Sequence, residues 1–125
     1  MHKAVEEWFK QADYDFKTAE AMCTSRRYIY AVFMCHLCLE KALKGLIAHA
    51  GETPSRSHDL VYLLECSGVQ ATEVFADFIE SLNEVSVPTR YPDELDRMVA
   101  QYPRRRTVEI VGQTREVLQW LRSCL

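Results

Sequence analysis

The chain has 125 residues and a mass of 14.5 kDa, which is long enough for one hydrophobic core and too short for two ordinary domains. Hydrophobic residues make up 48% and charged residues 26%, with four glycines and four prolines, a composition that excludes a disordered chain and favours helices. A net charge of -3 and a pI near 5.8 exclude a protein that coats nucleic acid through its bulk charge, so any contact with nucleic acid has to be a local patch. We predict a single domain over residues 1–125.

The sequence also predicts the compartment. Residues 1–16 carry charges throughout and lack the apolar core of a secretory signal. The longest nearly apolar run, residues 28–39, contains His36 and is shorter than the roughly 20 residues that cross a bilayer. The five cysteines are an odd number without the spacing of a disulfide framework: Cys23, Cys35, Cys38, Cys66 and Cys124. These features predict a cytoplasmic protein with reduced thiols and no membrane contact.

Two long helices are predicted first. Apolar residues recur at steps of three or four from Val5 to Cys23, with charges on the other face, which predicts an amphipathic helix over about residues 3–24. A second helix is expected over about residues 27–50, and its first half is apolar nearly all round. Such a helix needs cover on more than one side, so it lies either at the centre of the bundle or at a subunit interface.

The next segment is a loop followed by a short helix. Gly51 and Pro54 interrupt the helical pattern, and Ser57 and Asp59 are candidate N-caps for a short apolar helix that ends at Gly68.

Two further helices are predicted in the C-terminal half. Apolar spacing indicates one over about residues 71–85, after which Pro88 and Pro92 disfavour helix at the residues before them. A stretch without a clear pattern follows, and Thr107 can cap a last helix with an apolar face over residues 108–121. Because no segment sustains a period of two, we predict an all-α, up-and-down bundle of about five helices.

Short connections make neighbouring helices antiparallel, so the end of the second helix, the start of the third and the end of the fourth should meet. The polar residues expected at this end are His58, Asp59, Arg90 and Tyr91, with Lys44 and His49 nearby.

Cys35 and Cys38 have the two-residue spacing that zinc sites and redox motifs use. A structural zinc needs four ligands, and no second pair completes the set. The pair also lies inside an apolar helix. We therefore predict that both thiols pack in the core, and that the protein has no metal site and no cofactor.

Two basic segments each allow two interpretations. Glu40 and Lys44 can pair one turn apart, so Lys41 and Lys44 either belong to a solvated stripe or form part of an anion-binding surface. Arg104, Arg105 and Arg106 either form a solvated basic turn or attract phosphate at the start of the last helix, where they oppose the helix dipole.

His58 and Arg90 also allow a structural and a functional interpretation. His58, next to Asp59, can hold the loop at a helix start, or it can bind phosphate and transfer protons, since histidine titrates near neutral pH. Arg90 can lock its proline-flanked loop to a carboxylate, or it can present its planar fork to phosphate.

The chain resembles a HEPN domain (higher eukaryotes and prokaryotes nucleotide-binding domain). The resemblance rests on AVFMCHLCLEKALKGLIAHAGETPSRSHDLVYLL followed by TRYPDE: a helical Glu-Lys-x-x-Lys segment, a proline-containing loop, His-Asp-Leu and then Arg-Tyr-Pro. The N-terminal helix with Trp8 and ADYDFKTAEA is also similar to the family. The likeness covers nearly the whole chain, and the order and spacing of the motifs are more specific than any one of them.

The resemblance implies a helical bundle that dimerises and is often encoded beside a minimal nucleotidyltransferase. Members bind nucleotides or act as metal-independent ribonucleases, often as the toxin of a toxin–antitoxin pair. The ribonuclease members share an arginine followed by four to six residues and a histidine. That motif is missing here, because one residue separates Arg56 from His58 and eight separate Arg27 from His36. Whether the chain is an enzyme stays open.

The leading hypothesis is a homodimer that binds a nucleotide or RNA phosphate and works with a minimal nucleotidyltransferase in a two-component system. The candidate ligand-binding residues are His58, Asp59 and Arg90, then Arg56, Lys44 and Tyr91. One alternative is an RNA-cleaving toxin with His58 as acid or base and Arg90 as stabiliser of the transition state. The other alternative is a scaffold that only binds a partner protein.

Overall fold

The computed structural model describes residues 2–85 and 92–125, and every regular element in these ranges is an α-helix. The helices are α1 (Lys3–Thr24), α2 (Tyr28–His49), α3 (Leu60–Ser67), α4 (Glu73–Asn83), α5 (Pro92–Gln101) and α6 (Arg104–Ser123). The predicted all-α bundle is confirmed, with six helices in these ranges where about five were expected.

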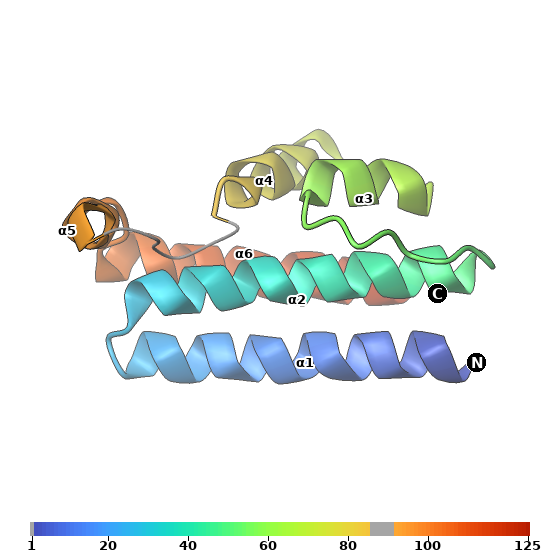
Figure 1. Cartoon of the computed structure of the whole chain (residues 1–125), viewed down its shortest axis with the longest axis horizontal. Coiled ribbons are helices and arrows are strands. Elements are labelled where there is room, and N and C mark those ends of the chain that lie inside the picture. Colours follow the sequence, from blue (N-terminus) through green and yellow to red (C-terminus); the bar gives the residue numbers. More distant parts are fainter. Residues whose placement is uncertain (1, 86–91) are drawn as a thin grey trace.

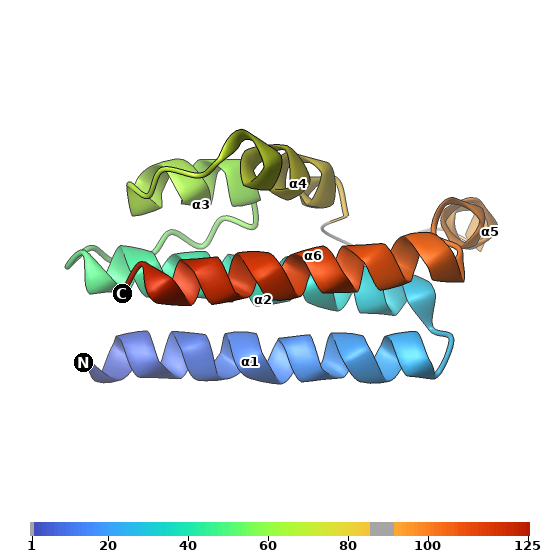
Figure 2. The same cartoon turned by 180° about the vertical axis from the view of Figure 1, so that it is seen from behind.

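The helix α2 is the centre of the bundle. It runs antiparallel to α1, with α6 alongside, and the short helices α3 and α4 lie over the side of α2 that faces away from α1 (Figures 1 and 2). The helix α5 crosses the end at which α6 begins. Each of the other five helices contacts α2. The helix α2 is therefore the centre of the bundle. One apolar side of its first half stays partly exposed in the single chain: Tyr30, Phe33, Met34 and Leu37.

The helices α1 and α2 pack very closely. Val5, Phe9 and Phe16 line the buried face of α1 at the spacing that the sequence predicts. Opposite them on α2 stands Gly45, where an added Cβ would lie 2.7 Å from the Phe9 ring and 3.2 Å from the Trp8 Cβ. A glycine at this position therefore lets the two helices approach to a distance that a larger residue would prevent.

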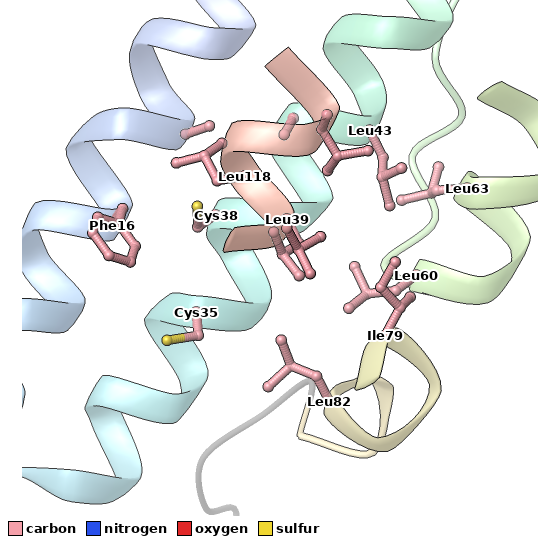
Figure 3. Close-up of a cluster of buried hydrophobic side chains, with 14 of the residues drawn as sticks. Phe16, Cys35, Cys38, Leu39, Leu43, Leu60, Leu63, Ile79, Leu82 and Leu118 are labelled. Atoms are coloured by element: carbon pink, nitrogen blue, oxygen red, sulfur yellow. The ribbon is translucent and has the colours of Figure 1, made fainter. Parts of the chain in front are cut away.

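The apolar core lies between α2 and the helices around it (Figure 3). Leucine and isoleucine side chains of α2, α3, α4 and α6 fill it, and Phe16 contributes from α1. Cys35 and Cys38 are fully buried among them. The prediction that these two thiols pack as small hydrophobic groups is confirmed.

Two details of the C-terminal half differ from the prediction. The last helix begins at Arg104 after Pro103, and Thr107 is a buried residue of its first turns whose hydroxyl donates to the Pro103 carbonyl at 3.0 Å. The prediction that Thr107 is the N-cap of the last helix is therefore wrong. The helix α5 fills the stretch for which no pattern was found, and Pro92 stands at its first position, where proline needs no N–H partner.

No helix in the described part of the chain is both long enough and apolar enough to span a membrane.

Candidate functional site

A buried carboxylate, Glu40 of α2, is the centre of a polar cluster inside the bundle. Its Oε2 lies 3.1 Å from Lys44 Nζ, one turn further along α2, and its Oε1 lies 2.9 Å from His58 Nδ1. Glu40 and Lys44 are buried, whereas the His58 side chain is 70% exposed. Charged groups are tolerated in a core only when they are paired and hydrogen-bonded, and these contacts supply both conditions.

The connection between α2 and α3 brings His58 to this cluster. It runs back along α2 instead of turning sharply at the end of that helix (Figure 1). The prediction that His58 lies at the end of the bundle near His49 is therefore wrong, because its partner Glu40 precedes His49 by about 13 Å of helix. The expected proximity of His58 to Lys44 is confirmed through their shared partner Glu40.

Both lysines of α2 are engaged in internal ion pairs. Lys44 also lies 5.8 Å from the centre of the Trp8 ring, a cation–π distance. Lys41 Nζ lies 2.7 Å from Oδ2 of Asp15, a buried carboxylate of α1. The predicted pairing of Glu40 with Lys44 is confirmed. The alternative in which these residues form a solvated stripe is wrong for Glu40 and Lys44, because both are buried.

His36 is the most deeply buried polar residue near the cluster. Its side chain is 0% exposed, its Nδ1 lies 3.9 Å from Glu40 Oε1, and neither ring nitrogen has a hydrogen-bond partner of ordinary geometry. Burial lowers the pKa of His36 below the usual value for histidine, and the negative charge of Glu40 opposes this shift. The neutral imidazole is the form that this environment favours.

Asp59 has a structural role at the start of α3. It is the N-cap, as predicted, because its Oδ1 accepts a hydrogen bond of 3.1 Å from the Tyr62 N–H. The same oxygen accepts from Asn83 Nδ2 at 2.9 Å, and Asn83 Oδ1 accepts from the Leu60 N–H at 2.7 Å. The hydrogen bonds from Tyr62 and then Asn83 lower the pKa of Asp59. The end of α4 thus meets the start of α3, as the sequence predicts.

The remaining predicted site residues are Arg56, Arg90 and Tyr91. Arg56 is exposed in the loop before α3, and no ion pair holds it within the described ranges. Two serines of the loop bond to its own backbone. Ser55 Oγ accepts a hydrogen bond from the Ser57 N–H at 3.1 Å, and Ser57 Oγ accepts one from the Asp59 N–H at 3.0 Å. Arg90 and Tyr91 lie outside the described residues.

Two members of this neighbourhood were not predicted. Asn83 of α4 accepts a hydrogen bond from the start of α3, and the buried His36 lies one turn before Glu40 on α2. A signal for His36 existed, because it precedes Glu40 by four residues and therefore faces the same side of a helix. Asn83 gave no such signal, since its partners Asp59 and Leu60 are far away in sequence.

The arginines before the predicted last helix form its first turn instead. The Arg105 side chain is 94% exposed, and its Nε lies 3.9 Å from Glu109 Oε1. Arg106 donates to the Gln101 carbonyl at 2.7 Å and lies over the Tyr102 ring at 4.5 Å. Arg104 has no ion pair among the residues that the structure describes.

Cysteines and carboxylates do not gather into a metal centre in the described ranges, where no group of three or more metal-ligating side chains occurs. Burial raises the pKa of the Cys35 thiol to about 12 and that of Cys38 well above its usual value, so both thiols stay protonated.

The chemistry of the cluster is set by the pairing of His58 with Glu40. A carboxylate accepts hydrogen bonds and donates none, so Nδ1 of His58 carries the proton that Glu40 binds. The other ring nitrogen, Nε2, is then free to accept a proton in the neutral ring, or to donate a hydrogen bond in the charged ring. The cluster thus presents one oriented imidazole to solvent, which suits phosphate binding or proton transfer.

Comparison with known proteins identifies the family. The sequence model of the HEPN domain matches residues 5–124. The fold is similar to the crystal structure of TT1696 from Thermus thermophilus, with a TM-score of 0.86 and 24% identity over 99% of this chain and 100% of that one. It is also similar to ST0689, an archaeal HEPN homologue, with a TM-score of 0.78 and 25% identity over 98% of both chains. No sequence among the curated proteins matches this chain. From the match over residues 5–124 we conclude that the chain belongs to the HEPN domain family.

Proposed function

We propose that this protein is a nucleotide- or RNA-binding HEPN protein that acts as a homodimer with a minimal nucleotidyltransferase, in a two-component system of the toxin–antitoxin kind. The observation that carries the binding role is the hydrogen bond of 2.9 Å between His58 and the buried Glu40. Glu40 holds the ring in one orientation, and His58 nevertheless keeps most of its side chain in solvent. The ring is therefore oriented and accessible, as a ligand-binding group has to be.

The other site residues take different parts in this proposal. Arg56, exposed two positions before His58, supplies a permanent cation for phosphate. Lys44 acts through Glu40, because the ammonium fixes the carboxylate that orients His58. Asp59 holds the loop at the start of α3. Arg90 and Tyr91 stay in the proposal on the strength of the sequence alone.

The homodimer and the nucleotidyltransferase partner are proposed from family membership. The apolar side of α2 that the chain leaves partly exposed is a further argument for the homodimer: Tyr30, Phe33, Met34 and Leu37. The similar fold of ST0689, an archaeal HEPN homologue, supports the assignment of the bundle and not of a partner.

A metal-independent ribonuclease is the second candidate, and the pairing of Glu40 with His58 is what favours it. In that mechanism His58 transfers the proton, and Arg90 stabilises the charge on the phosphate in the transition state. Cleavage of a single-stranded RNA oligonucleotide in the presence of EDTA, lost in His58→Asn, would select this candidate over binding alone.

The binding role is tested with two substitutions of His58. Asparagine places an amide N–H near the position of Nδ1, so His58→Asn keeps the donor to Glu40 and removes Nε2, whereas His58→Ala removes both. We expect His58→Asn to bind ATP or an RNA oligonucleotide at least about tenfold more weakly in calorimetric titrations, with an unchanged melting temperature.

The matched control is His49→Ala, an exposed histidine of α2 with no bond to the cluster among the described residues. It should bind as the wild type does. If His58→Asn binds ATP and RNA with wild-type affinity, His58 is not a ligand-binding residue. A protein that binds neither probe, yet binds a partner protein tightly, would be the scaffold.

A further inference from the structure

A cleft of about 580 Å³ opens at the end of the bundle where α1 turns into α2 and α6 begins. Figures 1 and 2 both place the α1–α2 turn and the start of α6 at this end. The lining residues are Cys23, Thr24, Arg26, Tyr28, Arg104 and Val108. Its volume lies within the range of about 300–1,000 Å³ that small-molecule sites occupy.

The charge of the cleft is positive and uncompensated. Arg26 and Arg104 line it, no acidic residue does, and neither arginine has an ion pair within the described part of the chain. The nearest acidic residues along α1 and α6 are engaged elsewhere. Glu20 pairs with Arg115 at 3.0 Å, and Glu109 lies 3.9 Å from Arg105.

Two helix N-termini add to this positive potential. Tyr28 is the first residue of α2 and Arg104 is the first of α6, and both line the cleft. Neither helix has a side-chain cap or an acidic residue in its first turn. Arginines at the start of α6 oppose the helix dipole, an arrangement that an anion bound between them would relieve.

From these observations we infer that the cleft is a second binding site, for the phosphate groups of a nucleotide or an RNA strand, with Arg26 and Arg104 as its phosphate donors. Two guanidinium forks suit the oxygens of a di- or triphosphate, and the half-buried Tyr28 offers an aromatic ring and a hydroxyl beside them. The site does not rest on the role of His58, because Tyr28 precedes Glu40 by about 18 Å of helix.

The backbone at the cleft provides a sharp variant. Arg26 has a φ of 64°, in the left-handed region that glycine adopts without strain. Arg26→Gly therefore removes the guanidinium and relieves the backbone, so its melting temperature should equal or exceed that of the wild type. If its melting temperature does equal or exceed that of the wild type, a loss of affinity in this variant does not come from unfolding. The second variant, Arg104→Gln, keeps most of the side-chain length and removes the charge.

The matched control is Arg105→Gln. Arg105 is next to Arg104 in the same helical turn, is 94% exposed and does not line the cleft. The substitution changes the net charge by the same amount as Arg104→Gln. Any difference between the two variants therefore reports the cleft and not the bulk charge.

The experiment measures the affinities of pyrophosphate, ATP and an unstructured RNA oligonucleotide by calorimetry at several salt concentrations. We expect Arg26→Gly and Arg104→Gln each to weaken binding of at least one probe about tenfold or more, and to reduce its salt slope by about one. Arg105→Gln should change affinity less than about twofold. Weakening for ATP would identify a nucleotide as ligand, and weakening confined to the oligonucleotide would identify an RNA strand.

Equal losses of affinity in Arg104→Gln and Arg105→Gln would show an effect of bulk charge and overturn the proposed site. Wild-type affinities of Arg26→Gly and Arg104→Gln for all three probes would overturn it as well. His58→Asn separates this proposal from the first. If only His58→Asn weakens binding, the cleft is not a binding site and the role of His58 stands. If only the two arginine variants weaken binding, the cleft is a binding site and His58 is not a ligand-binding residue.

Discussion

At the scale of single residues, His36 should make folding sensitive to pH. The folded protein keeps this ring neutral because burial lowers its pKa, whereas the unfolded chain protonates it below about pH 6.5. The stabilisation is therefore fully present above that pH and is lost as the pH falls toward the lowered pKa. We expect the free energy of unfolding to fall by up to about 1.4 kcal/mol per pH unit in this window.

Urea unfolding of wild type and His36→Leu between pH 7.5 and 5 measures this effect. Leucine has a similar volume and leaves no unsatisfied nitrogen, so the variant should be about as stable as the wild type at pH 7.5 and should lose most of the slope. His49→Ala, which removes an exposed histidine from the same helix, should retain it. An unchanged slope in His36→Leu would show that another group titrates.

At the scale of elements, the contact between α1 and α2 should be tested at Gly45. Alanine favours a helix over glycine by about 1 kcal/mol, but here its Cβ would lie 2.7 Å from the buried ring of Phe9. Overpacking of this kind costs about 1–3 kcal/mol, so Gly45→Ala should destabilise the protein by about 1 kcal/mol, as measured by chemical denaturation.

Gly112 of α6 is the matched control for that substitution. An added Cβ there meets nothing within 4 Å, so Gly112→Ala gains helix propensity without a clash. It should stabilise the protein by about 0.5–1 kcal/mol. If Gly45→Ala is stabilising as well, then α1 and α2 separate at little cost, and the close approach is not a requirement of the fold.

At the scale of the whole molecule, the proposed homodimer has a direct test. Light scattering at micromolar concentration should give twice the chain mass of 14.5 kDa. Exposed large apolar residues occur on each of the six described helices, so these residues do not by themselves select one interface: Tyr14, Tyr30, Tyr62, Val74, Leu95, Val99 and Val108. A mass of one chain would remove the homodimer from the proposal and leave both phosphate sites to be judged by their own experiments.

Much of the fold was predictable from local signals. The spacing of apolar residues located α1 and α2 to within a residue or two, and Asp59 and Gly68 marked the two ends of α3. These features depend on residues three or four apart, which a sequence shows directly. Where the local pattern was weak, prediction failed, as at α5 and at the start of α6.

The candidate site shows where sequence reasoning ends. The sequence alone determined that Glu40 and Lys44 pair, because one turn of helix separates them. Only the tertiary structure decided that this pair is buried and that His58 completes it. That outcome depends on the path of the connection between α2 and α3, which could have turned at the end of α2 and instead runs back along it. Loop paths are set by contacts between residues far apart in the chain, and no periodic pattern encodes them.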